Sequence, residues 1–426
     1  MSALTSALDT LASGRPESGD GWLAELRRAG RASFDEQGLP HPKMEAWRGT
    51  NVTALDKIPF VAATPGEHPT HPLANLERSG LRLVFSAGQL VSTEGELADG
   101  LWVGTFADAV EHFGDRMRDW ATGEETEFGA FEALNRAFLG DGAVVVVEPN
   151  ATIEAPVEIV YGLAPQSSEA LQQPRTLIVA GDGSRVQVLE TFAGSGEITT
   201  LTNAVARVLI GENASVEHAR VQIEGPEAWH VSTVTSRQKR DSRYTAHHMN
   251  LGARVARHNT RAVLDGEGGN CLLNGLYLAS GDQHVDNDTV LDHAKPNCDS
   301  RELYKGILAD KARSVFTGRI IVREDAQQTD AKQSNPNLLL SPTALAQTRP
   351  QLEIYADDVK CTHGATIGQM DADAIFYLRS RGLSEETARN LMIHAVAREV
   401  LEAIEAPALR AALTAEVDAR LDALEG

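Results

Sequence analysis

Gly181-Asp182-Gly183-Ser184-Arg185-Val186 and Gly211-Glu212-Asn213-Ala214-Ser215-Val216 follow one pattern and lie 30 residues apart along the chain. Each begins with glycine, continues through short polar and small residues, and ends on valine. Asp310-Lys311-Ala312-Arg313-Ser314-Val315 is a weaker version of the same pattern. Short corners that return at a fixed interval are typical of a solenoid, in which each coil stacks on the preceding coil.

The segments that follow these corners alternate between apolar and polar residues, as in 185–190 and 215–221. A period of two indicates a strand with one buried face. The alternation extends from about residue 143 to about residue 360, with almost no helical periodicity. A sandwich, a barrel and a β-helix are all compatible with such a stretch, and the repeated corners favour the β-helix.

Helical patterns are found on both sides of this stretch. Residues 1 to about 60 and about 105–139 carry apolar residues at helical spacing, and Gly38, Pro40 and Pro42 end the first pattern. After residue 370, Asp371 and Ser384 are placed to cap two helices, and Pro407 separates a third. The sequence therefore predicts a mainly β protein: an N-terminal helical region with a mixed linker (1–140), a β-helix core (141–368) and a C-terminal helical domain (369–426).

Composition excludes several classes of partner. The formal net charge is -21, which disfavours binding to nucleic acid or to an anionic membrane surface. The N-terminus shows no basic segment followed by an apolar one, so we expect no signal peptide. Cys271, Cys298 and Cys361 are too few and too scattered for a disulfide framework. These features predict a cytoplasmic protein with reduced thiols.

Cys361 and His363 form the sharpest local motif, within Lys360-Cys361-Thr362-His363-Gly364. If the strand that begins near Leu352 continues, these two side chains project from the same face. A thiolate and an imidazole can together bind iron or zinc, but a closed tetrahedral site needs four ligands. The missing ligands would have to come from distant residues or from another chain. A buried cysteine beside a hydrogen-bonded histidine is the alternative.

Other polar groups suggest weaker hypotheses. Alternation places Asp286, Asp288 and Asp292 on one face, where they would resemble a calcium site, an acid/base pair or simply a solvated acidic surface. His247 and His248 point to opposite faces in a strand, so a shared ligand role is not expected. Phosphate-binding and nucleophile-elbow motifs are absent from the sequence, which argues against ATP hydrolysis by this chain.

From Asp292 onward the sequence resembles the SufB/SufD family of iron–sulfur cluster assembly proteins. The segments that carry the resemblance are Asp292-His293 with Pro296, Tyr304-Lys305-Gly306, 325–331, Gln333-Ser334-Asn335, 337–341, 350–366 and 376–382. Near the N-terminus, Gly38-Leu39-Pro40 and Lys43-Met44-Glu45-Ala46-Trp47-Arg48 also resemble the openings of SufD chains. Gly364 stands where SufB-type chains usually carry glutamate, so the resemblance is to SufD.

The resemblance implies a right-handed parallel β-helix between helical domains, in a scaffold subunit that is not an enzyme. It implies pairing with a SufB-like subunit through the β-helix ends, and docking of a SufC-like ABC-type ATPase on the C-terminal helices, with Tyr377, Arg379 and Arg381 as docking candidates. His363, and with it Cys361, would help to hold a transient iron–sulfur cluster opposite a SufB cysteine. A homodimer of the free chain, a SufB-like cluster-carrying role and a β-helix carbohydrate-active enzyme remain as alternatives.

Overall fold

The computed structural model describes residues 4, 6–9, 21–66, 73, 80–122, 129–139, 142–164, 166, 168–194 and 196–423. Two β-sheets, here called sheet A and sheet B, form most of it. Sheet A consists of β1 (Val61–Ala62), β4 (Leu101–Thr105), β5 (Ala143–Val147), β7 (Ala170–Gln172), β8 (Arg175–Ala180), β10 (Thr200–Ile210), β12 (Ala228–Gln238), β14 (Val255–Leu264), β16 (His284–His293), β18 (Arg313–Val322) and β20 (Leu345–Ile354). Sheet B consists of β2 (Arg82–Ser86), β3 (Gln89–Glu94), β6 (Val157–Leu163), β9 (Arg185–Gly194), β11 (Ser215–Gln222), β13 (Arg243–Asn250), β15 (Asn270–Ala279), β17 (Asp299–Leu308), β19 (Thr329–Leu339) and β21 (Val359–Gly368).

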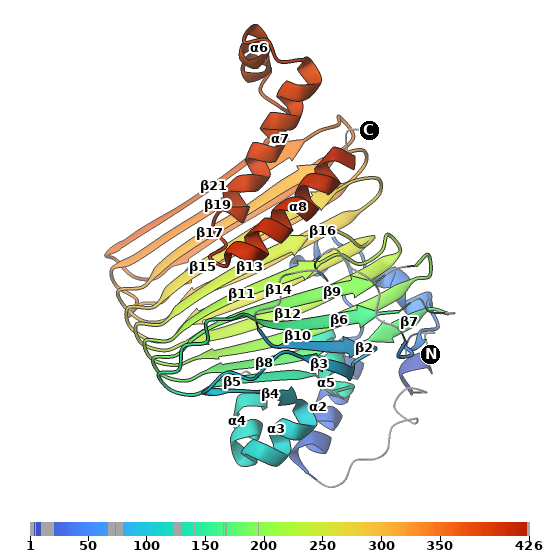
Figure 1. Ribbon diagram of the computed structural model, residues 1–426, viewed down its shortest axis with the longest axis vertical. Coiled ribbons are helices and arrows are strands. Elements are labelled where there is room, and N and C mark those ends of the chain that lie inside the picture. Colours follow the sequence, from blue (N-terminus) through green and yellow to red (C-terminus); the bar gives the residue numbers. More distant parts are fainter. Residues whose placement is uncertain are drawn as a thin grey trace.

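From β10 onward, successive strands alternate between the two sheets, and each pairs in parallel with the strand two places earlier in the chain. This is the connectivity of a parallel β-solenoid, and it confirms the predicted fold class. Figure 1 shows the coils stacked in sequence order, from β4 and β5 at one end to β21 at the other. Apolar side chains from the inward faces of both sheets form one core that runs along the solenoid.

The two corners that carry the repeat stack directly on each other. Gly183 donates its amide to the carbonyl of Glu212 (2.7 Å), and the carboxylate of Asp182 accepts the amide of Glu212 (2.8 Å). Gly183 and Asn213 have positive φ angles of 69° and 57°, a conformation that glycine and asparagine adopt most readily. The pattern therefore repeats because each corner needs one residue with a positive φ angle and must form hydrogen bonds with the next corner.

Helices cover both sheets. The N-terminal helical elements are α2 (Trp22–Gln37), α3 (Phe106–Phe113), α4 (Asp115–Thr122) and α5 (Ala130–Ala137), with 3₁₀ turns η1 (Glu45–Trp47) and η2 (Thr53–Lys57). Phe131 and Leu134 of α5 pack against Leu201, Trp229 and Val231 on the outer face of sheet A. The pattern at 105–139 thus forms three short helices, and the mixed linker before it contains β2, β3 and β4.

The C-terminal helices are α6 (Ala372–Ser380), α7 (Glu385–Leu401) and α8 (Pro407–Ala423). Asp371 and Ser384 cap α6 and α7 as the sequence predicts, through the amides of Asp373 and Thr387. An apolar cluster joins α7 and α8 to the outer face of sheet B, and Figure 1 shows both helices lying across that sheet while α6 projects beyond it. In the described residues, no helix is long and apolar enough to cross a membrane.

Candidate functional site at the open end of the solenoid

The two ends of the solenoid differ. At the N-terminal end, antiparallel strands β3 and β4 finish the sheets, and α3 and α4 pack beside β4. At the C-terminal end, β20 and β21 each have a strand neighbour on one side only among the described residues. Large apolar side chains are exposed there, including Leu345, Ile354, Tyr355 and Ile367. Edge strands with unpaired backbone groups and exposed apolar side chains are a template for strand addition, so this end is a candidate pairing surface.

Cys361 and His363 both lie in β21, on its inward face. Their partners across the ladder, Ala331 and Gln333, are buried inside the preceding coil. Inward side chains therefore lie in the core at β19, whereas inward side chains at β21 lie at an open surface. Cys361 packs partly against the core, whereas His363 is exposed. The structure thus places the thiol and the imidazole on one face of the edge strand, as the alternation predicts.

Protonation of the thiol follows from its surroundings. Partial burial raises the pKa of the Cys361 thiol, and the nearby Asp330 carboxylate acts in the same direction. The free thiol is therefore protonated at neutral pH, and binding of a thiophilic metal would have to displace its proton. The described residues contain no group of three or more His, Cys, Asp or Glu side chains that could hold a metal.

A buried carboxyl lies behind His363. The inward positions of β17, β19 and β21 bring Glu302, Gln333 and His363 into one column across the ladder. Gln333 donates its side-chain amide to Glu302 (2.6 Å). Burial raises the pKa of Glu302 to about 7, and the charge of Asp288 adds to this shift. Sequence reasoning missed Glu302, because residues 299–304 show no apolar–polar alternation that would mark position 302 as inward-facing.

Glu302→Gln should change how stability depends on pH. Between the ordinary pKa of 4.5 and the folded-state value of about 7, the folded chain retains a proton that the unfolded chain has lost. The free energy of unfolding must therefore fall as pH rises through that window, by up to about 3 kcal/mol. Glutamine mimics the protonated carboxyl and should remove this contribution. Denaturant unfolding at pH 5 and pH 8 tests the prediction, and parallel pH profiles for both proteins would contradict it.

The other cysteines lie away from the open end. Cys271 in β15 and Cys298 before β17 are buried, and burial raises the pKa of both thiols, to about 11 for Cys298. The Cys298 thiol donates to the carbonyl of Gly266 (3.3 Å). All three cysteines are free thiols, as expected from their spacing. Only Cys361 is placed where a second chain could reach it.

The acidic cluster is not the solvated surface considered from the sequence. Asp286 and Asp292 are buried, with 1% and 2% of their surface exposed. Arg257 contacts both Asp286 and Asp288, and Arg323 forms two hydrogen bonds with Asp292 (2.7 and 2.9 Å). Arginine therefore neutralises all three carboxylates, which does not favour a calcium site or an acid/base pair.

The adjacent histidines are also buried. His247 and His248 lie on opposite faces of β13, as expected, but neither is at the surface. His247 contacts Glu217 (3.1 Å), and His248 contacts the hydroxyl of Tyr304 (3.2 Å) inside the solenoid.

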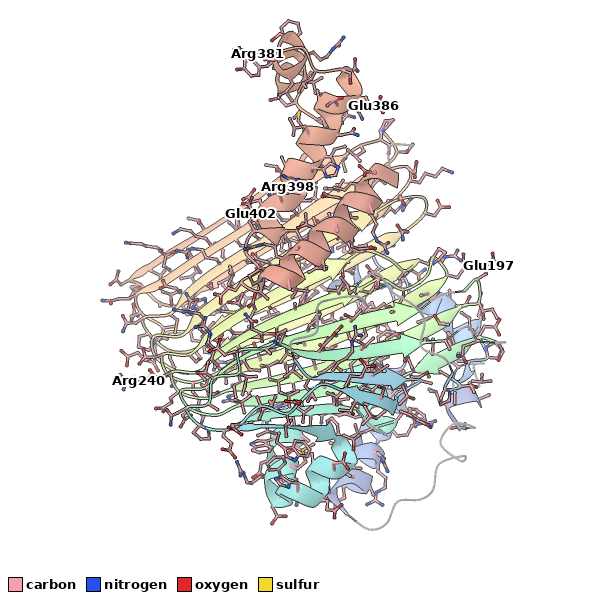
Figure 2. The ribbon with its side chains drawn as sticks, viewed as in Figure 1. Glu197, Arg240, Arg381, Glu386, Arg398 and Glu402 are labelled. Atoms are coloured by element: carbon pink, nitrogen blue, oxygen red, sulfur yellow. The ribbon has the colours of Figure 1, made fainter. Side chains whose placement is uncertain are left out.

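Of the candidate docking residues, Tyr377 and Arg379 lie on α6 and Arg381 directly follows it. This helix has no buried residue, and Phe376 and Tyr377 are 73% and 57% exposed. Arg381 lies over the ring of Tyr377 (5.1 Å), and Arg379 forms an ion pair with Glu385 (3.0 Å). Figure 2 shows Arg381 at the tip of the helical segment that projects beyond the solenoid. An exposed aromatic pair on a projecting helix is a second surface that favours a partner.

Comparison with known proteins agrees with these features. The family model described as "SUF system FeS cluster assembly, SufBD core domain" matches residues 163–396, which contain β7 to β21, α6 and most of α7. The chain belongs to the SufBD family. It is 32% identical to a SufBD family protein of Synechocystis over 94% of this chain and 92% of that protein. It is 32% identical to SufD of Escherichia coli (90% of each chain) and 26% identical to SufD of Bacillus subtilis (88% of each chain).

These matches confirm the family resemblance drawn from residues 292–382. The relatives named SufD agree with the prediction that the chain is SufD-like. As a SufD-like member of the SufBD family, the chain is part of the Suf iron–sulfur cluster assembly system.

Proposed function

We propose that this SufBD protein is a non-catalytic scaffold subunit that closes its open coil against a SufB-like subunit. The observation that carries the proposal is the position of Cys361 and His363, on the inward face of an edge strand that has no second strand neighbour in the described part of the chain. A nascent iron–sulfur cluster is the cargo of the resulting interface. The exposed helix α6 docks a SufC-like ATPase.

Pairing through the open end uses both sheets. Each of β20 and β21 presents a row of backbone donors and acceptors, so a partner with similar edges extends both sheets at once. Ile354 and Ile367 would be covered in the process, which adds a hydrophobic contribution to the backbone hydrogen bonds. The same end is available to a second copy of the chain when no partner is present, which makes a homodimer the expected state of the isolated chain.

The ligand count supports a shared site. Cluster iron is bound by thiolate and imidazole ligands, and this chain offers one of each at the interface. A SufB-like subunit that adds a cysteine from its own terminal coil would bring further ligands to the same seam. Cluster binding would then depend on pairing, which suits a protein that must release its product.

The C-terminal helices connect the ATPase to the solenoid. From α6 the chain enters α7, whose Ile393 and Ala397 pack in the same apolar cluster as Leu276 and Ile307 of sheet B. Lys305 in β17 also forms an ion pair with Glu399 of α7. A force applied to α6 by dimerising ATPase subunits would pass through α7 to β15 and β17, and would shift the paired solenoids relative to each other.

Co-purification with SufB-like and SufC-like partners of the native host tests the proposed function. After anaerobic reconstitution, we expect iron and sulfide in the complex and little in the isolated chain. A full cluster complement on the isolated chain would instead support a SufB-like carrier role. Failure of the chain to enter the complex would refute the scaffold proposal itself.

Phe376→Asp should weaken ATPase docking at least about tenfold, because an exposed aromatic anchor of this kind commonly contributes 2 kcal/mol or more to binding. Phe376→Leu keeps an apolar side chain and should retain most of the affinity. Calorimetric titration with the SufC-like protein measures both variants. Equal affinity of wild type and Phe376→Asp would exclude this face of α6 as the docking surface.

A further inference from the structure

Residues 43–50, the strap, lie across the outer face of sheet A. The aromatic ring of Trp47 lies over the guanidinium of Arg257 in β14 (4.2 Å). Arg257 is buried and contacts Asp286 and Asp288 of the next strand, β16. The buried charges that resembled a catalytic or calcium-binding group in the sequence therefore hold the strap in place.

The strap is anchored again at its end. Thr50 is fully buried, and its hydroxyl contacts Asp286 and the Nε2 atom of His284 (2.8 Å). Gly49 has a φ of 109°, and a β-carbon at this position would lie 3.1 Å from Val315 of β18. Only glycine allows the strap to lie this close to the sheet with this backbone conformation. These contacts fix the strap before any partner arrives.

The strap also reaches the last coil. Arg349 of β20 donates from its Nη1 atom to the carbonyl of Arg48 (2.7 Å). The side chain of Arg48 itself is exposed, and none of the carboxylates that the structure describes pairs with its guanidinium. Met44 is also exposed on the strap. The strap thus holds the cationic residue Arg48 beside the open edge of sheet A.

We infer that the strap is part of the partner-binding surface, and that the guanidinium of Arg48 binds a carboxylate on the outer face of the partner strand that pairs with β20. This inference rests on the proposed pairing. An added strand would lie about 4.8 Å beyond β20, within reach of an arginine held at β20. Because the strap is already ordered by Trp47 and Thr50, this contact costs little conformational entropy. The contact of Arg48 with the partner carboxylate gives specificity for one face of the partner. The edge strands contribute backbone hydrogen bonds that do not depend on sequence.

Charge reversal at Arg48 tests this inference. Affinity for the SufB-like partner is measured at low salt and at 0.5 M salt for wild type, Arg48→Met and Arg48→Glu. We expect about threefold weaker binding for Arg48→Met and at least tenfold for Arg48→Glu at low salt, with a smaller difference at high salt. Arg240→Glu is the matched control, because Arg240 is exposed at a corner four coils from the open end (Figure 2).

The outcomes separate the inference from the proposed function. No binding by wild type would refute the pairing, and the inference with it. Normal binding by wild type and Arg48→Glu alike would refute the role of the strap alone. If Arg48→Glu weakens only self-association, measured by analytical ultracentrifugation, the strap belongs to a homodimer interface and the assigned partner is wrong. The unfolding midpoint should be unchanged in both variants because Arg48 is exposed.

Discussion

His363→Ala is expected to abolish stable cluster formation in the assembled complex while leaving the complex intact. The imidazole is exposed on the inward face of β21, so its removal neither opens a cavity nor breaks a core contact. Loss of a residue that only supports a metal ligand typically costs 10- to 100-fold in affinity. Loss of a ligand from a site shared by two chains should cost at least about as much. Iron and acid-labile sulfide per complex, after anaerobic reconstitution, measure the effect.

Thr362→Ala is the matched control, because Thr362 is exposed on the opposite face of the same strand. It should assemble clusters like wild type. Cys361→Ser separates the two candidate ligands, and a smaller loss in this variant would make His363 the principal ligand of this chain. A wild-type cluster content in His363→Ala, with pairing intact, would remove the imidazole from the site.

The fold was predictable because a solenoid repeats its signals. Corners at 181–186 and 211–216 share a glycine or asparagine that must adopt positive φ, so the repeat is visible in single residues. The N-terminal region was less predictable. Its short strands β2 and β4 form by pairing with β6 and β5, and β3 forms by pairing with β2. Such tertiary contacts leave no periodic pattern in a short segment.

The site was predictable only in part, for a related reason. Alternation correctly placed Cys361 and His363 on one face, but it could not show that this face is the inward side of an uncovered coil. The sequence could not show that Asp286 and Asp288 are buried or paired, because their partners Arg257 and Thr50 are distant in sequence. Glu302 was missed because a carboxyl facing inward is expected to be excluded from a core unless it is neutral.

The inward side chains of the last coil differ from those of the coil before it. The inward positions of β19 are buried by β21, whereas those of β21 have no later coil to bury them. The inward side chains of β17 and nearly all of those of β19 are enclosed between neighbouring coils. The last coil therefore has the interior face of a solenoid and the exposure of a surface, which is the combination expected where a second solenoid completes the stack.

Ile367→Asp tests whether a partner solenoid covers the last coil. We expect this substitution to reduce affinity for the SufB-like partner at least about 100-fold. Ile367 is inward-facing in β21, across the ladder from Asn337, and is 47% exposed. In the isolated chain an aspartate here stays hydrated, so folding should be unaffected. Pairing would bury it without a counter-ion and forfeit the apolar contact, and these two costs together amount to several kcal/mol. Calorimetric titration with the partner measures the change.

Leu97→Asp provides the comparison, because Leu97 is 54% exposed in the loop between β3 and β4, at the opposite end of the solenoid. It makes the same change in charge and removes a similar apolar area, yet it should bind the partner normally. Equal affinity for Ile367→Asp and Leu97→Asp would mean that the partner does not cover the open coil. Cys361 and His363 would then face solvent in the complex, and a cluster could not be shared across that seam.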